Sequence, residues 1–313
     1  MNKIYKLFVL IFTVCLSLSL LSCSVEVKNS QSENYSIILP TGAPSIGLSK
    51  FIKETNYTVD IVSGSDMLVA AFTQESYDVI VAPVNLGVKF YNQVEDFGYI
   101  LYRPIVGCNY YILSNEELSF EDLDGKEMES FNEAATPGVM LKTLCKYYGI
   151  EPIVHYNSSV GEVNPLLLSG KASIVLTAEP SKTVVESKKS FYSIDILALW
   201  QEMAGNTYNV PQAGIFIKKE LINNTEYLRM LIEMDKSIEA NPSVLAECAV
   251  EVDQNLSSMN VELLAKAIPN CHYIKTQVNK EEVNFYLSKI IELGLGKTIG
   301  NKLPDDSFYY KEN

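Results

Sequence analysis

The chain has 313 residues, with 25 lysines and arginines against 38 aspartates and glutamates, and a formal net charge of −13. This length is enough for two domains of ordinary size, each with its own apolar core. The acidity disfavours a nucleic-acid partner, because phosphate binding needs clustered Lys and Arg. Arg103 and Arg229 are the arginines of the chain, too few to hold an anion by several bidentate contacts.

The cysteines and histidines of the chain do not form a metal-binding pattern. His155 and His272 supply the imidazoles, and the later cysteines have no C-x-x-C spacing. We therefore expect no metal site and no cofactor. Cys145 lies at helical spacing among apolar residues, which favours a packed thiol. A disulfide outside the cell is left open among four residues: Cys108, Cys145, Cys248 and Cys271.

The first 23 residues have the pattern of an export signal. Two lysines precede an uncharged, mostly apolar run over residues 7–21, shorter than the roughly 20 residues of a membrane-spanning helix. The sequence Leu-Leu-Ser-Cys at 20–23 resembles the lipobox of bacterial lipoproteins. That resemblance implies that residues 1–22 are removed and that a lipid on Cys23 anchors the protein to the outside of the cell membrane. An ordinary secretory signal is the alternative.

A regular alternation of strands and helices follows a polar tether over residues 23–34. Strands are predicted over 35–39, over 57–62 by apolar alternation, and over 77–83 by a continuous apolar run typical of a sheet covered on both faces. Helices are predicted from about 43 to 53 and from 66 to 74. Strands separated by such helices predict a mostly parallel α/β sheet. Helical patterns dominate later, over 221–238, 242–252, 261–267 and 281–293, before a turn-rich end from 296 to 313.

A weak internal repeat predicts two lobes. Residues 65–83 and 158–180 share the order of hydroxyl residue, apolar helix, polar turn and apolar strand, although coincidence could produce it. Strand-like runs at 108–114 and 213–218 would cross between the lobes. We therefore expect lobe 1 over 35–113 and 213–313, and lobe 2 over 114–212.

Three loops with small or hydroxyl residues come directly before predicted helices: Thr41-Gly42-Ala43, Ser63-Gly64-Ser65 and Ala135-Thr136. A helix start presents unpaired N–H groups that can bind an anion or a polar ring edge. Plain helix capping is the alternative for each loop. In an open α/β sheet all three would lie at the carboxyl ends of strands, where ligands bind. Three further candidates are Val84-Asn85 and Glu179 after strands, and Tyr110, whose ring could stack on a ligand.

Enzyme signatures are weak, so we expect a protein that is not an enzyme. Gly296-Lys297-Thr298 imitates the end of a phosphate-binding loop, but Ile291 stands where the first glycine belongs. No G-x-S-x-G elbow occurs, and two histidines leave little room for a catalytic triad.

The chain after Cys23 resembles the solute-binding lipoproteins of ABC importers, in the nitrate, sulfonate, taurine and thiamine-pyrimidine-precursor group. The segments that carry the resemblance are residues 71–83, 120–126, 135–144, 168–172, 178–180, 267–271 and 299–310. It implies a two-lobed type II periplasmic-binding fold of mostly parallel sheets with flanking helices and two hinge strands. It also places the ligand between Thr41–Ala43, Ser63–Ser65 and Val84–Asn85 on one side and Ala135–Thr136 and Glu179 on the other.

The resemblance further implies a small organic solute, namely a sulfonate, a pyrimidine-like or related heterocycle, or a small carboxylate. A monomer would deliver this solute to an ABC permease and its ATPase. The loop over 132–136, Asn-Glu-Ala-Ala-Thr, departs from the family's glycine-containing loop. Glu133 there makes a doubly charged anion a poorer fit than a neutral, zwitterionic or singly charged ligand. The alternatives are a biosynthetic enzyme of the same fold and a tethered sensor subunit.

Overall fold

A computed structural model describes residues 34–133, 135–276 and 279–311. The predicted signal peptide, Cys23 and nearly all of the predicted tether lie outside these residues. Residues 34–313 form a unit that is considered by itself below. Within the described ranges, no helix has the length and apolar character that crossing a membrane requires.

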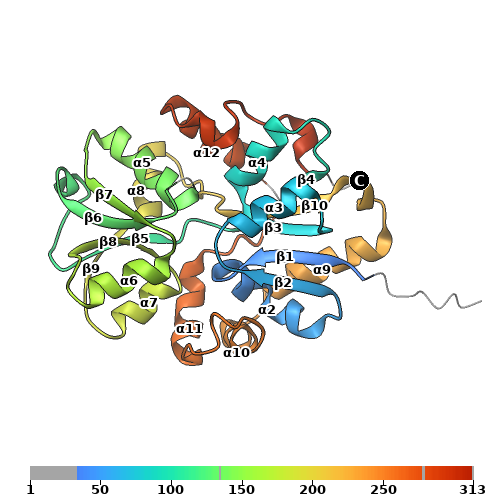
Figure 1. Cartoon of the computed structure of the whole chain (residues 1–313), viewed down its shortest axis with the longest axis horizontal. Coiled ribbons are helices and arrows are strands. Elements are labelled where there is room, and N and C mark those ends of the chain that lie inside the picture. Colours follow the sequence, from blue (N-terminus) through green and yellow to red (C-terminus); the bar gives the residue numbers. More distant parts are fainter. Residues whose placement is uncertain (1–33, 134, 277–278, 312–313) are drawn as a thin grey trace, which may run out of the picture. The chain divides into compact units, whose positions relative to one another are not determined.

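The first sheet has five strands in the order β2-β1-β3-β10-β4 (Figure 1). Its strands are β1 (Ser36–Pro40), β2 (Thr58–Val62), β3 (Val79–Pro83), β4 (Tyr99–Val106) and β10 (Ala213–Lys218). β1 pairs in parallel with β2 and β3, whereas β10 runs antiparallel to β3 and β4. The centre of β3 is fully buried, as its continuous apolar run predicts for a sheet covered on both faces.

The second sheet repeats this arrangement in the order β7-β6-β8-β5-β9. Its strands are β5 (Tyr110–Ser114), β6 (Glu127–Phe131), β7 (Ile153–Asn157), β8 (Ile174–Ala178) and β9 (Tyr192–Asp195). β5 takes the place of β10, since it runs antiparallel to β8 and β9. The predicted repeat is thus the same strand order used twice, and the α/β two-lobed fold is confirmed. The exact residue bounds of the lobes stay a prediction.

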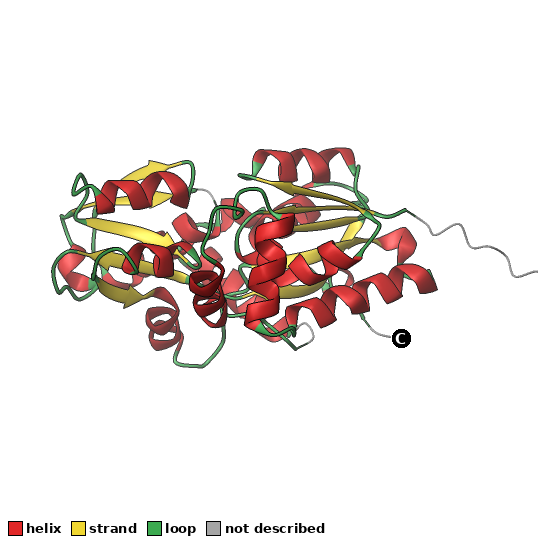
Figure 2. Ribbon diagram, turned by 90° about the horizontal axis from the view of Figure 1, so that it is seen from below, coloured by secondary structure: helices red, strands yellow, loops and turns green. Residues whose placement is uncertain are grey.

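Helices lie on both sides of the strands (Figure 2). Between the strands lie α2 (Ala43–Glu54), α3 (Asp66–Gln74), α4 (Val84–Gln93), α5 (Thr136–Tyr148), α6 (Val160–Leu168), α7 (Ser181–Glu186) and α8 (Ile196–Ala204). After β10 come α9 (Thr225–Ile238), α10 (Pro242–Val252), α11 (Val261–Ala267) and α12 (Lys280–Glu292). Asparagine side chains cap the starts of these last four helices.

The C-terminal helix α12 joins parts of the fold that are distant in sequence. It contacts α5, and in Figure 1 it lies between α5 and α4. The rings of Phe285 and Tyr286 meet the indole of Trp200 on α8, with centroids 6.1 and 5.8 Å apart. Tyr286 and Trp200 are both fully buried, so α12 is part of the core rather than an appendage.

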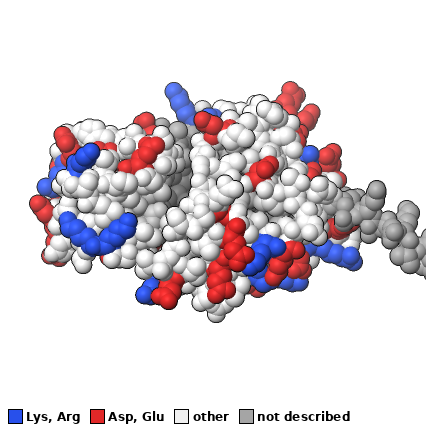
Figure 3. All heavy atoms as spheres, turned by 60° about the horizontal axis from the view of Figure 1, so that its bottom comes forward, with Lys and Arg blue, Asp and Glu red and all other residues white. Residues whose placement is uncertain are grey.

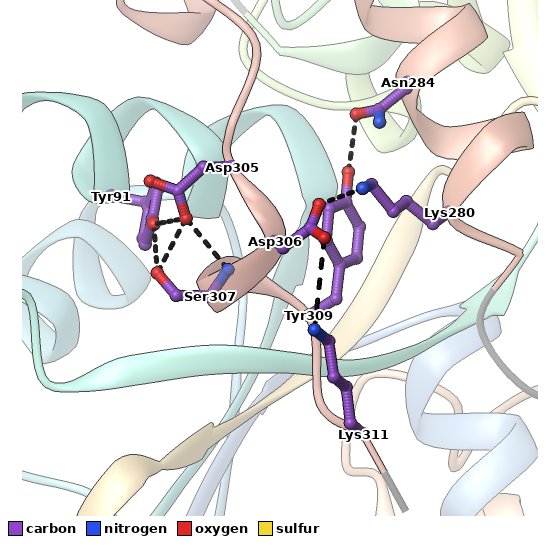
Figure 4. Close-up of polar contacts among 8 residues, drawn as sticks. All are labelled: Tyr91, Lys280, Asn284, Asp305, Asp306, Ser307, Tyr309 and Lys311. Atoms are coloured by element: carbon purple, nitrogen blue, oxygen red, sulfur yellow. Dashed lines mark hydrogen bonds and ion pairs between the residues drawn. The ribbon is translucent and has the colours of Figure 1, made fainter.

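The C-terminal segment holds α12 and α4 beside the edge strand β4. The Tyr310 amide donates to the Leu101 carbonyl of β4 at 2.9 Å. Three side-chain pairs complete the attachment (Figure 4): Tyr91 with Asp305, Tyr309 with Asn284, and Lys280 with Asp306. Hydrogen bonds from Tyr91 and Ser307 lower the pKa of the Asp305 carboxyl to about 2, so it remains an acceptor at any ordinary pH.

Candidate functional site

Two of the predicted site residues meet directly between the sheets. Asn85 is in the first turn of α4, which follows β3 of the first sheet, and Thr136 begins α5, which follows β6 of the second. The Thr136 hydroxyl donates to Asn85 Oδ1 at 3.2 Å, with only 1% and 2% of the two residues exposed. The structure therefore brings together candidates that the sequence placed on opposite lobes.

Three more polar side chains surround this contact. Tyr110 is buried on β5, Gln212 precedes β10, and Tyr286 is buried on α12. The Gln212 carbonyl accepts the Val84 amide, next to Asn85, at 3.1 Å. The Tyr110 ring meets the ring of Phe131 at the end of β6, with centroids 6.2 Å apart. α12, which carries Tyr286, packs against α5, which begins at Thr136. We call Asn85, Tyr110, Thr136, Gln212 and Tyr286 the polar cluster.

The polar cluster consists of uncharged hydrogen-bonding groups. Burial raises the pKa of Tyr110 and Tyr286 well above the ordinary value of 10, so both phenols keep their protons at physiological pH. The remaining members are two amides and a hydroxyl, which do not titrate. Such a set recognises a ligand by the arrangement of donors and acceptors and not by charge.

The helix starts beside the polar cluster offer few free backbone donors. The Val84 amide, first in α4, already donates to the Gln212 carbonyl at 3.1 Å. In α5 the second position is Pro137, which has no N–H, and the Ala135 amide before it donates to the Asn132 carbonyl. Anion binding at a helix start depends on such N–H groups, and each of these two starts keeps only part of its set, since Pro83 before α4 has no N–H either.

The loop after β1 is held by a buried carboxylate that the sequence analysis did not identify. The hydroxyls of Thr41 and Ser45 donate to Asp253 Oδ2 at 2.7 and 2.6 Å, and the Ala43 carbonyl accepts from Tyr273 at 2.7 Å. Gly42 takes φ +96°, a conformation that favours glycine. These hydrogen bonds fix the loop at the connection after α10, and they do not involve the polar cluster.

The second predicted loop lies against the same connection. The Ser63 hydroxyl donates to the side-chain oxygen Oδ1 of Asn255 at 3.2 Å. The backbone amide of Asn255 in turn donates to Asp253 Oδ1 at 2.9 Å. Gly64 is exposed, and Ser65 precedes α3 without making a side-chain capping bond. Plain helix capping, the alternative to a ligand-binding role for this loop, is therefore not what the Ser65 side chain does.

The Glu179 carboxylate is hydrogen-bonded to the first turn of α7. Its carboxylate accepts from the Thr183 amide at 3.1 Å and from the Thr183 hydroxyl at 2.9 Å, and only 3% of the residue is exposed. Burial raises the pKa of this carboxyl above its ordinary value of 4.5. The Asn109 side chain binds the Glu179 carbonyl at 3.1 Å, so Glu179 lies next to the crossing into β5.

The two segments that cross between the sheets are joined by one side chain. Asn209 Oδ1 accepts from the Cys108 amide at 2.9 Å and from the Val210 amide at 2.8 Å. His272 Nδ1 lies 2.6 Å from the Cys108 carbonyl oxygen. The predicted crossings at 108–114 and 213–218 thus begin next to each other, close to Gln212 of the polar cluster.

A separate hollow of about 570 Å³ lies at the C-terminal segment. Its lining residues are Ile100, Lys219, Ile222, Asp306, Ser307, Tyr309, Tyr310 and Lys311. None of them was a predicted site residue, and none belongs to the polar cluster.

The charged side chains and the cysteines are not members of the polar cluster. On the face drawn in Figure 3, basic and acidic side chains are interspersed, and a furrow runs between the two halves. Across the part of the chain that the structure describes, no three His, Cys, Asp or Glu side chains form a group able to hold a metal ion. The four cysteines among those residues are unpaired, and Cys145 packs against the core as predicted, with its pKa raised by burial to about 12.

Comparison with known proteins finds similarity in structure alone. No protein-family model matches the chain, and no curated protein matches it significantly. An ABC transporter structure from Parabacteroides distasonis is 17% identical with a TM-score of 0.72, and covers 90% of this chain and 99% of that one. The periplasmic aliphatic sulphonate binding protein SsuA from Escherichia coli is 11% identical with a TM-score of 0.62, covering 90% and 94%. The zinc-bound ligand-binding component of an ABC-type import system from Staphylococcus aureus is 12% identical with a TM-score of 0.59, covering 83% and 92%.

These similarities extend over almost the whole length of the known structures. At such low identity they establish the fold and not the ligand. The chain has the periplasmic-binding fold, and the resemblance stated from its sequence is confirmed at that level.

Proposed function

We propose that this chain is the extracytoplasmic solute-binding component of an ABC importer, which captures a small organic solute between its two lobes and delivers it to a permease and its ATPase. The observation that carries the proposal is the hydrogen bond between Asn85 of one lobe and Thr136 of the other. Both residues are among those that the sequence predicts to face a ligand from opposite sides. The fold shared with import proteins supports the same role.

The mechanism is a shift between open and closed arrangements of the lobes. A solute that bonds to both lobes has extra affinity only for the closed form, and so raises its population. Moving the closed:open ratio from 1:99 to 99:1 takes about 5.5 kcal/mol of differential binding. Several hydrogen bonds shared between the lobes, each of about 1 kcal/mol net, together with burial of an apolar ring can supply this. The permease would recognise the closed form.

The site residues of the proposal are those predicted from the sequence, and their contacts separate them into two groups. Asn85, Tyr110 and Thr136 lie in the polar cluster, with Val84 at its edge. The loops at 41–43 and 63–65 lie against the connection after α10, and Glu179 and Ala135 flank the helix starts of the second lobe. The candidate solutes remain a sulfonate, a pyrimidine-like or related heterocycle, and a small carboxylate.

Retention of a solute tests the proposal. The full chain, purified in mild detergent, is incubated with a filtered small-molecule extract and passed through a desalting column. Heat then releases bound compounds for mass spectrometry. We expect at least one small organic solute to be retained at one per chain. Retention of none, or chemical conversion of the retained solute by the protein alone, would contradict the proposal.

Paired substitutions link that retention to the site. Asn85→Ala combined with Thr136→Val removes the contact between the lobes, and we expect affinity for the retained solute to fall about tenfold or more, because two hydrogen-bonding groups are lost. The matched control is Thr143→Val in the same helix, whose hydroxyl bonds only to the Val139 carbonyl. Calorimetric titration that gives equal affinities for the two variants would argue against this site.

A further inference from the structure

Two buried atoms of the polar cluster have no hydrogen-bond partner among the residues that the structure describes. They are the hydroxyl oxygen of Tyr286 and the carboxamide oxygen Oε1 of Gln212. Tyr286 is fully buried, so its hydroxyl has no access to bulk water. Native proteins rarely bury a polar atom without a partner, because the atom loses its hydrogen bonds to water and no hydrogen bond within the protein replaces them. Nine buried side-chain atoms of the described residues lack a partner, and these two are the ones that belong to the polar cluster, where a bound solute could supply the partner.

These two atoms belong to the contact between Asn85 and Thr136. α12, which carries Tyr286, packs against α5, the helix that begins at Thr136. The Gln212 carbonyl also accepts the first amide of α4, next to Asn85. Tyr286 comes from the C-terminal helix and Gln212 from the second crossing, so the site draws on segments outside the predicted loops.

No charged side chain is part of this arrangement. The groups that shift the pKa of Tyr286, apart from burial, are the Thr136 hydroxyl and the Cys108 thiol. The nearest charged residue of the second-lobe loop, Glu133, is paired with Lys142 at 2.6 Å. The helix starts of α4 and α5 also keep only part of their N–H donors, as described above. An anionic group placed here would lose its hydration without gaining a counter-charge.

We infer that Tyr286 and Gln212 contact the solute and make the site selective for an uncharged molecule whose polar edge carries a hydrogen-bond donor beside an acceptor. This inference rests on the proposed function and narrows its solute class. Gln212 Oε1 can only accept, so it requires a donor on the solute, whereas the Tyr286 hydroxyl can donate to the adjacent acceptor. An amide, or a ring nitrogen beside a carbonyl, meets both demands, while a sulfonate or carboxylate offers acceptors alone. Sites built on buried polar groups discriminate strongly against ligands that leave those groups unpaired.

The first test needs no ligand. Tyr286→Phe removes a hydroxyl that has no partner within the described protein, so we expect the melting temperature of the full chain without ligand to be unchanged or higher. The matched control is Tyr227→Phe, since the fully buried Tyr227 donates to the Asp78 carbonyl at 2.6 Å. That variant should melt about 2–4 °C lower. An equal loss in both variants would overturn the inference, because the Tyr286 hydroxyl would then be structural.

The second test uses pairs of probes that differ mainly in charge: nicotinamide and nicotinate, uracil and orotate, ethanesulfonamide and ethanesulfonate. We expect an uncharged member to raise the melting temperature more than its anionic counterpart. The affinity of that member, measured by calorimetry, should fall about tenfold in Tyr286→Phe and in Gln212→Leu. It should be unchanged in Tyr227→Phe.

Three outcomes would overturn the inference while leaving the proposed function intact. The anionic members alone could bind, the uncharged members could bind with the same affinity in Tyr286→Phe, or the solute retained from the extract could be an anion. If no solute is retained from the extract, the proposed function itself fails. The two failures are therefore distinguished by the extract experiment.

Discussion

Asp253 shows how a single buried charge determines the shape of a loop far away in sequence. Its carboxylate is fully buried and accepts hydrogen bonds from the hydroxyls of Thr41 and Ser45 and from the backbone and side chain of Asn255. A buried carboxylate is tolerated only when several donors replace its hydration. Asp253 therefore belongs to the scaffold that positions the first two predicted loops.

Replacement of Asp253 by Ala should lower the free energy of unfolding by about 2–4 kcal/mol, because it removes several charge-assisted hydrogen bonds, from the hydroxyls of Thr41 and Ser45 and from Asn255. Urea denaturation of the full chain measures this. The control is Ser63→Ala, which removes one hydrogen bond from an exposed residue and should cost less than about 0.5 kcal/mol. Equal stability of Asp253→Ala and the native chain would refute the scaffold role.

Glu179 should make a distinct contribution to the pH dependence of stability. Burial raises its pKa above 4.5 in the folded protein, so folding favours the protonated form. The stabilisation is complete below pH 4.5 and is lost as the pH rises through the higher folded value. Glu179→Gln does not titrate. The melting temperature of the native chain minus that of the variant should therefore decrease as the pH rises above 4.5; an increase would show that ionised Glu179 is the stabilised form.

Some residues of the site can be predicted from the few residues around them in the sequence, whereas others reach the site only through tertiary packing. Asn85 and Thr136 could be predicted because each follows a strand and begins a helix, a pattern visible within a few residues. Tyr286 and Gln212 could not, since a tyrosine at helical spacing reads as core and only the packing of α12 against α5 brings it to the site. Asp253 was missed for the same reason.

At the scale of elements, the sequence predicted helices best where capping and apolar spacing agree. The bounds of α10 and α11 match the prediction, because Asn241 with Pro242 and Asn260 mark their starts. Strands gave weaker signals. β4, β6, β7 and β9 were not assigned, and in β7 exposed residues alternate with half-buried ones, as is usual at a sheet edge.

Gly87 tests how closely α4 is packed on the first sheet. A Cβ at this position would lie 2.1 Å from the ring of Phe216 on β10, so Gly87→Ala must shift either the helix or the ring. We expect a loss of about 1–3 kcal/mol in the free energy of unfolding. Gly161→Ala in α6 is the matched control, because its Cβ would meet only the Ser159 hydroxyl at 3.5 Å. Helix propensity predicts a gain of up to about 1 kcal/mol there. Equal effects would mean that α4 is loosely packed.

At the scale of the whole molecule, the two sheets are linked by packing and hydrogen bonds as well as by the two crossing segments of the chain. β5 and β10 take equivalent places in the two sheets, the crossings beside them share Asn209, and α12 packs against the second lobe while the C-terminal segment fastens it to the first. The repeat in the sequence predicted two lobes of similar build, but not the order of their strands. The role of α12 could not be predicted, because it depends on contacts between residues far apart in the sequence.

The location of the protein rests on the lipobox resemblance at residues 20–23. We expect Cys23→Ala to move the protein from the membrane fraction to the soluble fraction, since the lipid would have no attachment point. Immunoblots of fractionated cells measure this, with Cys145→Ala as the control that should stay in the membrane fraction. Retention of Cys23→Ala in the membrane would show that the anchor is something else.

The most direct test of the account is a crystal structure of the chain with the solute that it retains from a small-molecule extract. We expect that solute to lie between the two sheets, within hydrogen-bond distance of Asn85, Thr136 and Tyr286. A solute bound instead in the hollow beside Lys219 and Tyr310, or anywhere outside the polar cluster, would contradict it.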